Sequence, residues 1–171
     1  MAAAVPRVAT EGAVARYTWA VTRFALAFVF LWAFVDKLFG LGKATPAARA
    51  WLNGGSPTTG YLKNVKGPFA SVFNGLAGQA WADWLFMLGL LGIGAALLLG
   101  IGMRIAAASG ALLLLFMWAA SLPLANNPFV DDHVVYAVVL VGLAAAQAGD
   151  TLGLGRAWAG TGLVKRYPIL R

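Results

Sequence analysis

The chain has 171 residues, of which 61% are hydrophobic and 11% are charged, and its mean hydropathy is +0.77. Soluble domains carry about 25% charged residues, so the composition excludes a water-soluble fold and favours one domain embedded in lipid. The net charge of +7 does not indicate nucleic-acid binding, because the basic residues flank apolar segments, as topology signals and headgroup contacts do. The lack of cysteine excludes disulfides, thiolate metal sites, iron–sulfur clusters and dithiol relays.

The N-terminal part of the chain divides into a tail and a first apolar segment. Residues 1–15 are mostly small and include Pro6 and Gly12, which predicts a disordered cytoplasmic tail. The apolar segment at residues 17–39 is too long and too aromatic for a cleavable signal sequence. We therefore expect it to be a retained membrane-spanning helix.

Three further apolar segments follow, at residues 84–102, 105–124 and 133–149. Each is near the roughly 20 residues that a helix needs to cross the hydrocarbon core, and the last is the shortest. Internal hydrogen bonding makes helix the expected conformation. The predicted fold is all-α: a four-helix transmembrane bundle over residues 16–155, followed by a basic cytoplasmic tail at 156–171.

A long loop at residues 40–83 separates the first two spans. From Pro68 onward apolar residues recur at helical spacing, and they are Phe69, Val72, Phe73, Leu76 and Ala80. This spacing predicts an amphipathic helix lying on the outer membrane interface, with Trp81 and Trp84 at headgroup level. The loop is expected to act either as a lid over the bundle or as a docking surface.

The distribution of lysine and arginine predicts that both termini are cytoplasmic in a plasma membrane. The segments then placed inside carry Arg7, Arg16, Arg104, Arg156, Lys165, Arg166 and Arg171. The short outer loop before the fourth span carries Asp131 and Asp132 and no basic residue. The long outer loop, which carries Lys43, Arg49, Lys63 and Lys66, opposes this orientation.

Small residues recur four apart on the last three spans, and they are Gly92, Ala96, Gly100, Ala106, Gly110, Ala145 and Gly149. This spacing allows close contact between helices. Packing within the chain is the favoured interpretation, and a homo-oligomer is the alternative.

Two basic residues lie within the first span. Arg23, Phe30 and Lys37 are seven residues apart, so they share one stripe of the helix, which we expect to face the bundle. Arg23 either extends to the cytoplasmic headgroups or supports the bundle and holds a headgroup or a quinone carbonyl. Lys37 and the adjacent Asp36 form either an interfacial charge pair or one side of a polar pocket.

The other candidate site residues gather at the outer ends of the spans. Asp83 opens the second span, Trp118 lies in the outer part of the third, and Asp131, Asp132 and His133 open the fourth. Asp83 and one of the paired aspartates are candidate helix N-caps. Because one cap does not need two aspartates, the Asp131–His133 stretch is also a candidate for proton transfer.

His133 is the only histidine in the sequence. Histidine is the residue type most used for proton transfer, so this side chain is a candidate to exchange protons with a quinone, and the alternative is a purely structural hydrogen-bonding group. A single histidine cannot supply two axial haem ligands, so we expect no haem. We also expect no resident metal.

Several stretches together resemble the DoxX family of four-helix membrane proteins. They are RFALAFVFLWAFVDKLFGLG, with Arg23 and Lys37; WLNGGSPTTGYL and GPFASVFNGLAG in the loop; DWLFMLGLLGIGAALLLGIGMRIAA; NNPFVDDHVVYA; and AGDTLGLGRAW. Their order from Arg16 to the basic tail is similar to members related to the DoxD-type membrane subunit of thiosulfate:quinone oxidoreductase. No single stretch is specific for the family.

The resemblance implies a membrane redox role, with quinone (ubiquinone or menaquinone) as cofactor and a second redox subunit on the outer face. We expect the quinone to lie beside Trp118 and His133, with Arg23 and Asp83 as further cofactor-binding candidates. His133 paired with Asp132 would transfer protons, and Asp131 is a further catalytic candidate. Asp36 and Lys37 complete the set of catalytic candidates, and Lys37 or the loop lysines would attract an anion such as thiosulfate.

The alternative is a non-catalytic accessory subunit of a respiratory or oxidative-stress complex, with the long loop as its docking surface. The lack of a visible cofactor motif favours this alternative. A transporter is disfavoured, because the sequence has neither an inverted repeat nor a broken central helix. Membrane lipids are expected partners in every case.

Overall fold

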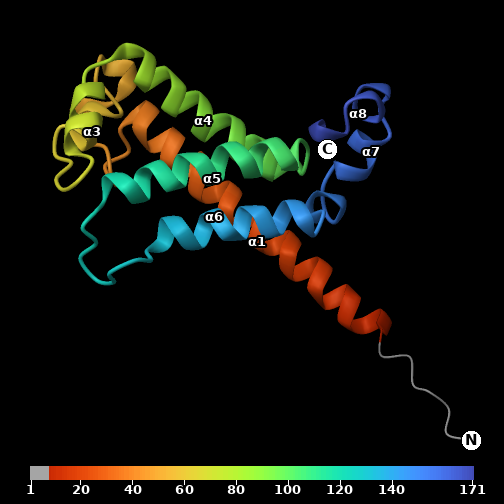
Figure 1. Cartoon of the computed structure of the whole chain (residues 1–171). Helices are drawn as coiled ribbons and strands as arrows, with labels where there is room; N and C mark the ends of the chain where they lie inside the picture. The colour runs from red at the N-terminus through yellow and green to blue at the C-terminus, as the bar shows by residue number, and fades with distance from the viewer. Residues whose placement is uncertain (1–7) are drawn as a thin grey trace, which may run out of the picture.

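The computed structural model describes residues 8–171, with side chains from Gly12 onward. The predicted disorder of residues 1–7 falls outside this range. The described residues are all-helical, as predicted, and contain no strand. The longest helices are α1 (Val8–Phe39), α4 (Ala80–Leu99), α5 (Met103–Ala120) and α6 (Asp132–Ala145) (Figure 1).

Helix α1 begins earlier than the sequence indicated. Residues 8–15, which were predicted to belong to the disordered tail, are helical. The stretch is rich in alanine, the residue with the highest helix propensity, and it continues directly into the apolar span. The predicted tail boundary at residue 15 is therefore wrong.

Three helices are long and apolar enough to cross a membrane, over Gly12–Phe39, Ala80–Leu99 and Met103–Ala120. Helix α6 has 14 residues and is about 21 Å long, less than the hydrocarbon thickness of about 30 Å. The predicted helix over 133–149 instead ends at Ala145, because Gln147 adopts a positive φ of 50°. The 3-10 turn η3 (Ala148–Asp150) follows.

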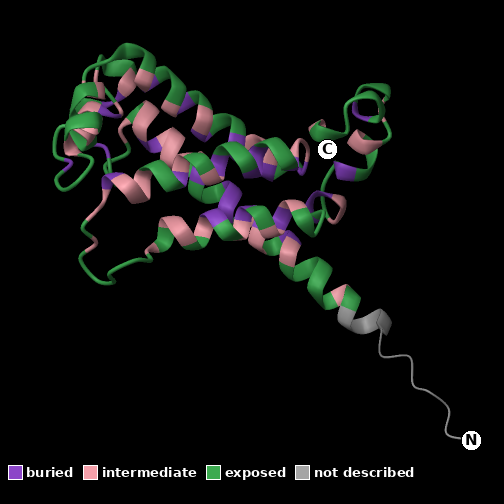
Figure 2. Cartoon of the chain, in the orientation of Figure 1, coloured by how far each residue is buried: buried purple, intermediate pink, exposed green. Residues whose placement is uncertain are grey.

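The four longest helices surround one apolar core. Helix α1 packs along α4, α4 contacts α5, α5 packs along α6, and α6 contacts α1. Leu26 and Phe30 of α1 meet Met87 and Leu97 of α4 and Leu140 of α6 in this core. The buried residues lie between the helices in Figure 2, where the outward faces are exposed.

Those outward faces are themselves apolar. Large hydrophobic side chains with more than half their surface exposed are found on all four helices, among them Phe28, Leu85, Leu88, Leu112, Phe116, Val138 and Val141. A water-soluble monomer rarely exposes continuous apolar surface on this scale. This surface matches the side of a helix that contacts lipid.

The long loop is folded, and its helical turns are η1 (Ala47–Arg49), η2 (Trp51–Asn53), α2 (Thr59–Leu62) and α3 (Ala70–Leu76). The helix predicted from Pro68 is present as α3, with Phe69 at its N-cap, but it ends at Leu76. Gly78, with φ 83°, separates it from α4, so Ala80 belongs to the next helix. Trp84 of α4 packs edge-on against Trp51, with ring centroids 4.7 Å apart.

The C-terminal segment folds back over the ends of the long helices. We call residues 151–171 the C-terminal cap; it contains α7 (Gly155–Ala159), α8 (Gly162–Arg166) and η4 (Pro168–Leu170). The amide of Leu154 donates to the carbonyl of Leu99 at the end of α4, with an N–O distance of 2.8 Å. The predicted basic tail is therefore a folded part of the domain.

Glycines allow close approach at two places, between Gly100 and Gly149 at the helix ends and at Gly110 within α5. A Cβ added to Gly149 would lie 2.2 Å from the carbonyl oxygen of Gly100, and one added to Gly110 would lie 2.7 Å from the side chain of Leu140. Gly92, in contrast, has nothing within 4 Å. The predicted close contacts are therefore present at Gly100, Gly149 and Gly110 but not at Gly92.

We predict that Gly149→Ala destabilises the folded chain by about 1–3 kcal/mol, because its methyl group would collide with backbone that cannot move aside. Thermal unfolding in detergent, followed by tryptophan fluorescence, measures the loss. Gly92→Ala is the matched control and should be neutral or slightly stabilising. Equal stability of the two variants would contradict the close Gly100–Gly149 contact.

Candidate functional site

Arg23 is completely buried and binds backbone carbonyls from two separate elements. Its Nη1 donates to the carbonyl of Leu97 and, at 2.8 Å, to that of Leu98, both in the last turn of α4. Its Nη2 donates to Leu152 at 2.8 Å and to Thr151 at 3.3 Å, at the start of the C-terminal cap. One guanidinium thus connects α1, α4 and the cap.

The surroundings of Arg23 explain how a charge is accommodated there. The last turn of a helix carries partial negative charge on its carbonyl oxygens, which stabilises a cation. The guanidinium carbon also lies 4.2 Å from the ring centre of Phe24. A Cβ on Gly153 would lie 3.1 Å from Nη2, so glycine is needed for the chain to approach. The prediction that Arg23 faces the bundle is confirmed, and the headgroup alternative is wrong.

Asp36 is 1% exposed and holds the first turn of the long loop. Its carboxylate accepts from the amide of Lys43 at 3.2 Å and from that of Ala44 at 3.0 Å. Two backbone donors satisfy a buried carboxylate without a cation. Asp36 therefore positions the loop where α1 ends.

Lys37 is half-buried and points elsewhere. Its Nζ lies 6.0 Å from the ring centre of Phe86 on α4, a cation–π distance. The ion pairs found among the described residues join other groups, so Asp36 and Lys37 are not in direct ion-pair contact. Lys37 does share the bundle-facing stripe with Arg23, as the spacing indicated.

Asp83 is buried in the first turn of α4 but does not cap the helix. The N-cap is Gln79, which makes no side-chain capping bond, so that prediction is wrong. The Asp83 carboxylate instead accepts from the hydroxyls of Ser56 at 2.8 Å and Thr58 at 2.6 Å, and from the Thr58 amide at 3.1 Å. It attaches the middle of the long loop to α4.

Trp118 fixes the connection between α5 and α6. Its indole Nε1 donates to the carbonyl of Phe129 at 3.1 Å. Within the same connection Asn127 accepts from the amides of Phe129 and Val130. The indole N–H of Trp118, beside which the quinone was expected, thus binds backbone in this structure.

His133 and Asp131 form a pair at the start of α6. Their Nδ1 and Oδ2 atoms are 2.7 Å apart, whereas the nearest oxygen of Asp132 is 3.7 Å from the same nitrogen. Asp131 is also the N-cap and accepts from the amide of Val134 at 3.3 Å. The carboxylate that pairs with His133 is therefore Asp131, and the sequence-based pairing with Asp132 needs this correction.

The geometry suits proton exchange better than cation binding. Ligand atoms of Asp131, Asp132 and His133 lie within 4.8 Å of one another, but the first and last are already bonded to each other. Burial raises the pKa of Asp131, and hydrogen bonds from His133 and the Val134 amide outweigh this effect, so its pKa lies below the ordinary value. Asp132 has 69% of its side chain exposed.

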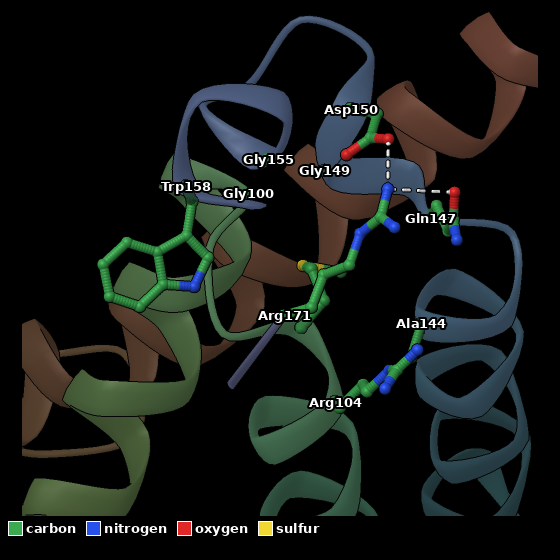
Figure 3. A pocket seen from close by; sticks show the side chains of 10 residues that line it. Gly100, Arg104, Ala144, Gln147, Gly149, Asp150, Gly155, Trp158 and Arg171 are labelled. Atoms are coloured by element: carbon green, nitrogen blue, oxygen red, sulfur yellow. Dashed lines mark hydrogen bonds and ion pairs between the residues drawn. The ribbon is translucent and has the colours of Figure 1, made fainter. Parts of the chain in front are cut away.

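Neither of the two best-defined pockets among the described residues joins these candidates. Asp36, Asp83 and Trp118 each bind a different part of the connecting loops. One pocket, of about 20 Å³, lies beneath the C-terminal cap and has room for about one water molecule (Figure 3). A second lies along the beginning of α1. Neither borders His133 or Trp118, so neither is the predicted quinone pocket.

Some polar contacts were not predicted from the sequence. Arg171 donates to Asp150 at 2.8 Å and to Gln147 at 3.1 Å (Figure 3), and Trp158 donates to the carbonyl of Leu170 at 2.6 Å. The sequence feature that could have indicated these contacts is the glycine-rich stretch AGDTLGLGRAW, because repeated glycine indicates close backbone approach. Its partner, the end of α4, is distant in sequence.

Comparisons of the chain with protein-family models, curated proteins and solved structures find no match. The functional argument therefore rests on the geometry of the chain itself.

We predict that Asp131→Ala destabilises the domain by about 1 kcal/mol, because the start of α6 loses its cap. Asp132→Ala is the matched control and should cost less, since its carboxylate is mostly exposed. Thermal unfolding of both variants in detergent at pH 7 measures the difference. Equal effects would contradict the assignment of Asp131 as the cap.

The cap contribution should also depend on pH. Since the pKa of Asp131 is lower in the folded state, its contribution is present above the ordinary aspartate pKa of about 3.9 and disappears as the pH falls through the lower folded value. The stability difference between the wild-type chain and Asp131→Ala should thus narrow below about pH 4. A difference that grows on acidification would contradict this linkage.

Proposed function

We propose that this chain is a DoxX-type integral membrane protein of the plasma membrane, built as a four-helix transmembrane bundle. We propose further that it acts as a non-catalytic accessory subunit of a respiratory or oxidative-stress membrane complex. The three apolar helices of spanning length and the exposed apolar faces of all four long helices support the membrane placement. The packing of α6 along α5 supports its inclusion in the bundle.

The observation that carries the accessory role is how the buried charged groups are used. Arg23, Asp36 and Asp83 are the charged residues that are almost fully buried among those described. Each of them binds backbone or loop hydroxyls of the chain itself. Ionisable groups inside a membrane protein commonly mark a transport or redox path, but these three stabilise the arrangement of helices and loops.

The orientation with both termini in the cytoplasm is supported by charge. The end of the domain that carries the C-terminal cap has exposed Arg104, Arg156, Lys165 and Arg166. Among the residues that the structure describes, Asp150 is the acidic residue at this end, and it is paired with Arg171. The opposite end carries Asp131 and Asp132. Basic residues flanking spanning helices are retained on the cytoplasmic side.

The proposed docking surface for a redox partner is the long loop on the outer face. Asp36 and Asp83 fix this loop at two points, so it offers a defined shape. Its exposed basic residues are Lys43, Arg49, Lys63 and Lys66. A partner with an acidic surface would be attracted to them.

The second candidate function is a quinone-linked oxidoreductase subunit that passes electrons from thiosulfate or a similar reductant to the quinone pool. The pair of His133 and Asp131, at 2.7 Å, favours this candidate, because an imidazole held by a carboxylate is a common arrangement for general acid–base proton transfer. The loop lysines would then attract the anionic reductant.

We predict that His133→Gln leaves both assembly and quinone reduction unchanged, as an accessory role requires. Blue-native electrophoresis of mild-detergent extracts tests assembly, and quinone reduction by thiosulfate in the isolated complex tests activity. Lys63→Glu with Lys66→Glu should release the chain from the complex, because the charges of the docking surface are reversed.

A fully assembled complex that loses quinone reduction in His133→Gln, but keeps it in Asp132→Asn, would establish the second candidate and overturn the first. Assembly that is unaffected by the loop charge reversals would contradict the docking surface. Extraction of the chain from membranes by alkaline carbonate would contradict the membrane placement itself.

A further inference from the structure

The C-terminal cap is locked against the ends of α4 and α5. The amide of Arg104, in the first turn of α5, donates to the carbonyl of Arg171 at 2.9 Å, and its guanidinium donates to Pro168 at 3.0 Å. Arg171 in turn pairs with Asp150. Since α4 and α5 have the length and apolarity of membrane spans, their ends lie at headgroup level in the proposed membrane placement.

The surface of the cap is strongly basic. Arg156, Lys165 and Arg166 are exposed, and so is Arg104 of α5, whose guanidinium binds the carbonyl of Pro168. Asp150 is the sole acidic residue between positions 134 and 171, and Arg171 neutralises it at 2.8 Å. The cap therefore presents several cations and no acidic side chain of its own.

The same segment also exposes apolar side chains, namely Leu152, Leu154, Leu163, Tyr167 and Ile169, each about half exposed or more. Its buried side is formed by Gly155 and Val164. Tyr167 lies 5.4 Å from the guanidinium of Arg166, so an aromatic and a cationic group stand together. Basic and apolar groups combined on short helices match the boundary between headgroups and acyl chains.

We propose that the C-terminal cap is a binding surface for anionic phospholipid headgroups, held at the membrane surface by its attachment to the helix ends. Arg156, Lys165 and Arg166 bind the phosphates, and the exposed leucines and Ile169 enter the acyl boundary. The charge favours an anionic over a zwitterionic lipid, and the exposed apolar side chains of the same segment favour lipid over a soluble anion. This inference rests on the proposed membrane placement.

The test uses the full chain, purified in detergent with an equal mixture of phosphatidylglycerol and phosphatidylcholine. Native mass spectrometry measures which lipid is retained, and we expect phosphatidylglycerol to be enriched. A basic residue near an anionic surface contributes about fivefold to affinity. The triple variant Arg156→Gln, Lys165→Gln, Arg166→Gln should therefore lower the enrichment at least about fivefold.

The matched control removes the same charge from the opposite end, as Lys43→Gln, Lys63→Gln, Lys66→Gln, and should keep the enrichment. Arg156→Lys with Arg166→Lys preserves the charge and should keep it too. Unchanged enrichment in the cap triple variant, or an equal loss in the loop variant, overturns the proposal. Because the substituted side chains are exposed, thermal unfolding should show all variants folded.

Failure of this inference is distinguishable from failure of the proposed function. A chain that resists carbonate extraction but shows no preference between the two lipids is embedded, and its cap does not bind anionic lipid. A chain released by carbonate is not embedded, which contradicts both the membrane placement and the binding of anionic lipid by the cap. Retained phosphatidylglycerol that inorganic phosphate displaces would identify a site for soluble anions instead.

Discussion

The arrangement of the whole domain depends on one buried guanidinium. Arg23 sits on the first helix and binds carbonyls at the end of α4 and at the start of the C-terminal cap, so it joins three parts of the chain that are far apart in sequence. A charged group within a membrane-spanning helix costs roughly 2.5–3.5 kcal/mol on insertion scales. Four carbonyl acceptors offset that cost, because each replaces a hydrogen bond that water would otherwise supply. The glycines at positions 100, 149 and 153 allow these carbonyls to come within reach.

The charged groups at the two ends of the domain are used in different ways. At the end where the cap lies, charge is either buried with Arg23 or paired between Arg171 and Asp150, and the remaining cations face outward. At the other end, Asp36 and Asp83 attach the long loop to α1 and α4, while His133 and Asp131 remain partly exposed. Of the two groups that can exchange protons, Asp131 also caps α6, whereas His133 bonds to Asp131. This use of the charged groups underlies the preference for an accessory role over a catalytic one.

The sequence predicts the helices better than it predicts their connections. Apolar runs of spanning length place α1, α4 and α5 within a few residues at most ends, because lipid-facing segments must satisfy their backbone internally. The seven-residue spacing of Arg23, Phe30 and Lys37 correctly identifies the stripe of α1 that faces the other helices. The acceptors of Arg23, Asp36 and Asp83 were not predictable, since they are backbone or hydroxyl groups brought near by the fold. The choice of Asp131 over Asp132 depends on the extended backbone of an N-cap, which residue types alone do not reveal.

The most direct test of this account is hydrogen–deuterium exchange on the full chain in detergent, comparing the wild-type protein with Arg23→Lys and Arg23→Met. We expect residues 148–158 and the last turn of α4 to lose protection in both variants, and more so in Arg23→Met. An ammonium cannot span both sets of carbonyls as the planar guanidinium does. The long loop, which Asp36 and Asp83 hold independently, should keep its protection. Unchanged protection of residues 148–158 in Arg23→Met would contradict the claim that Arg23 holds the domain together.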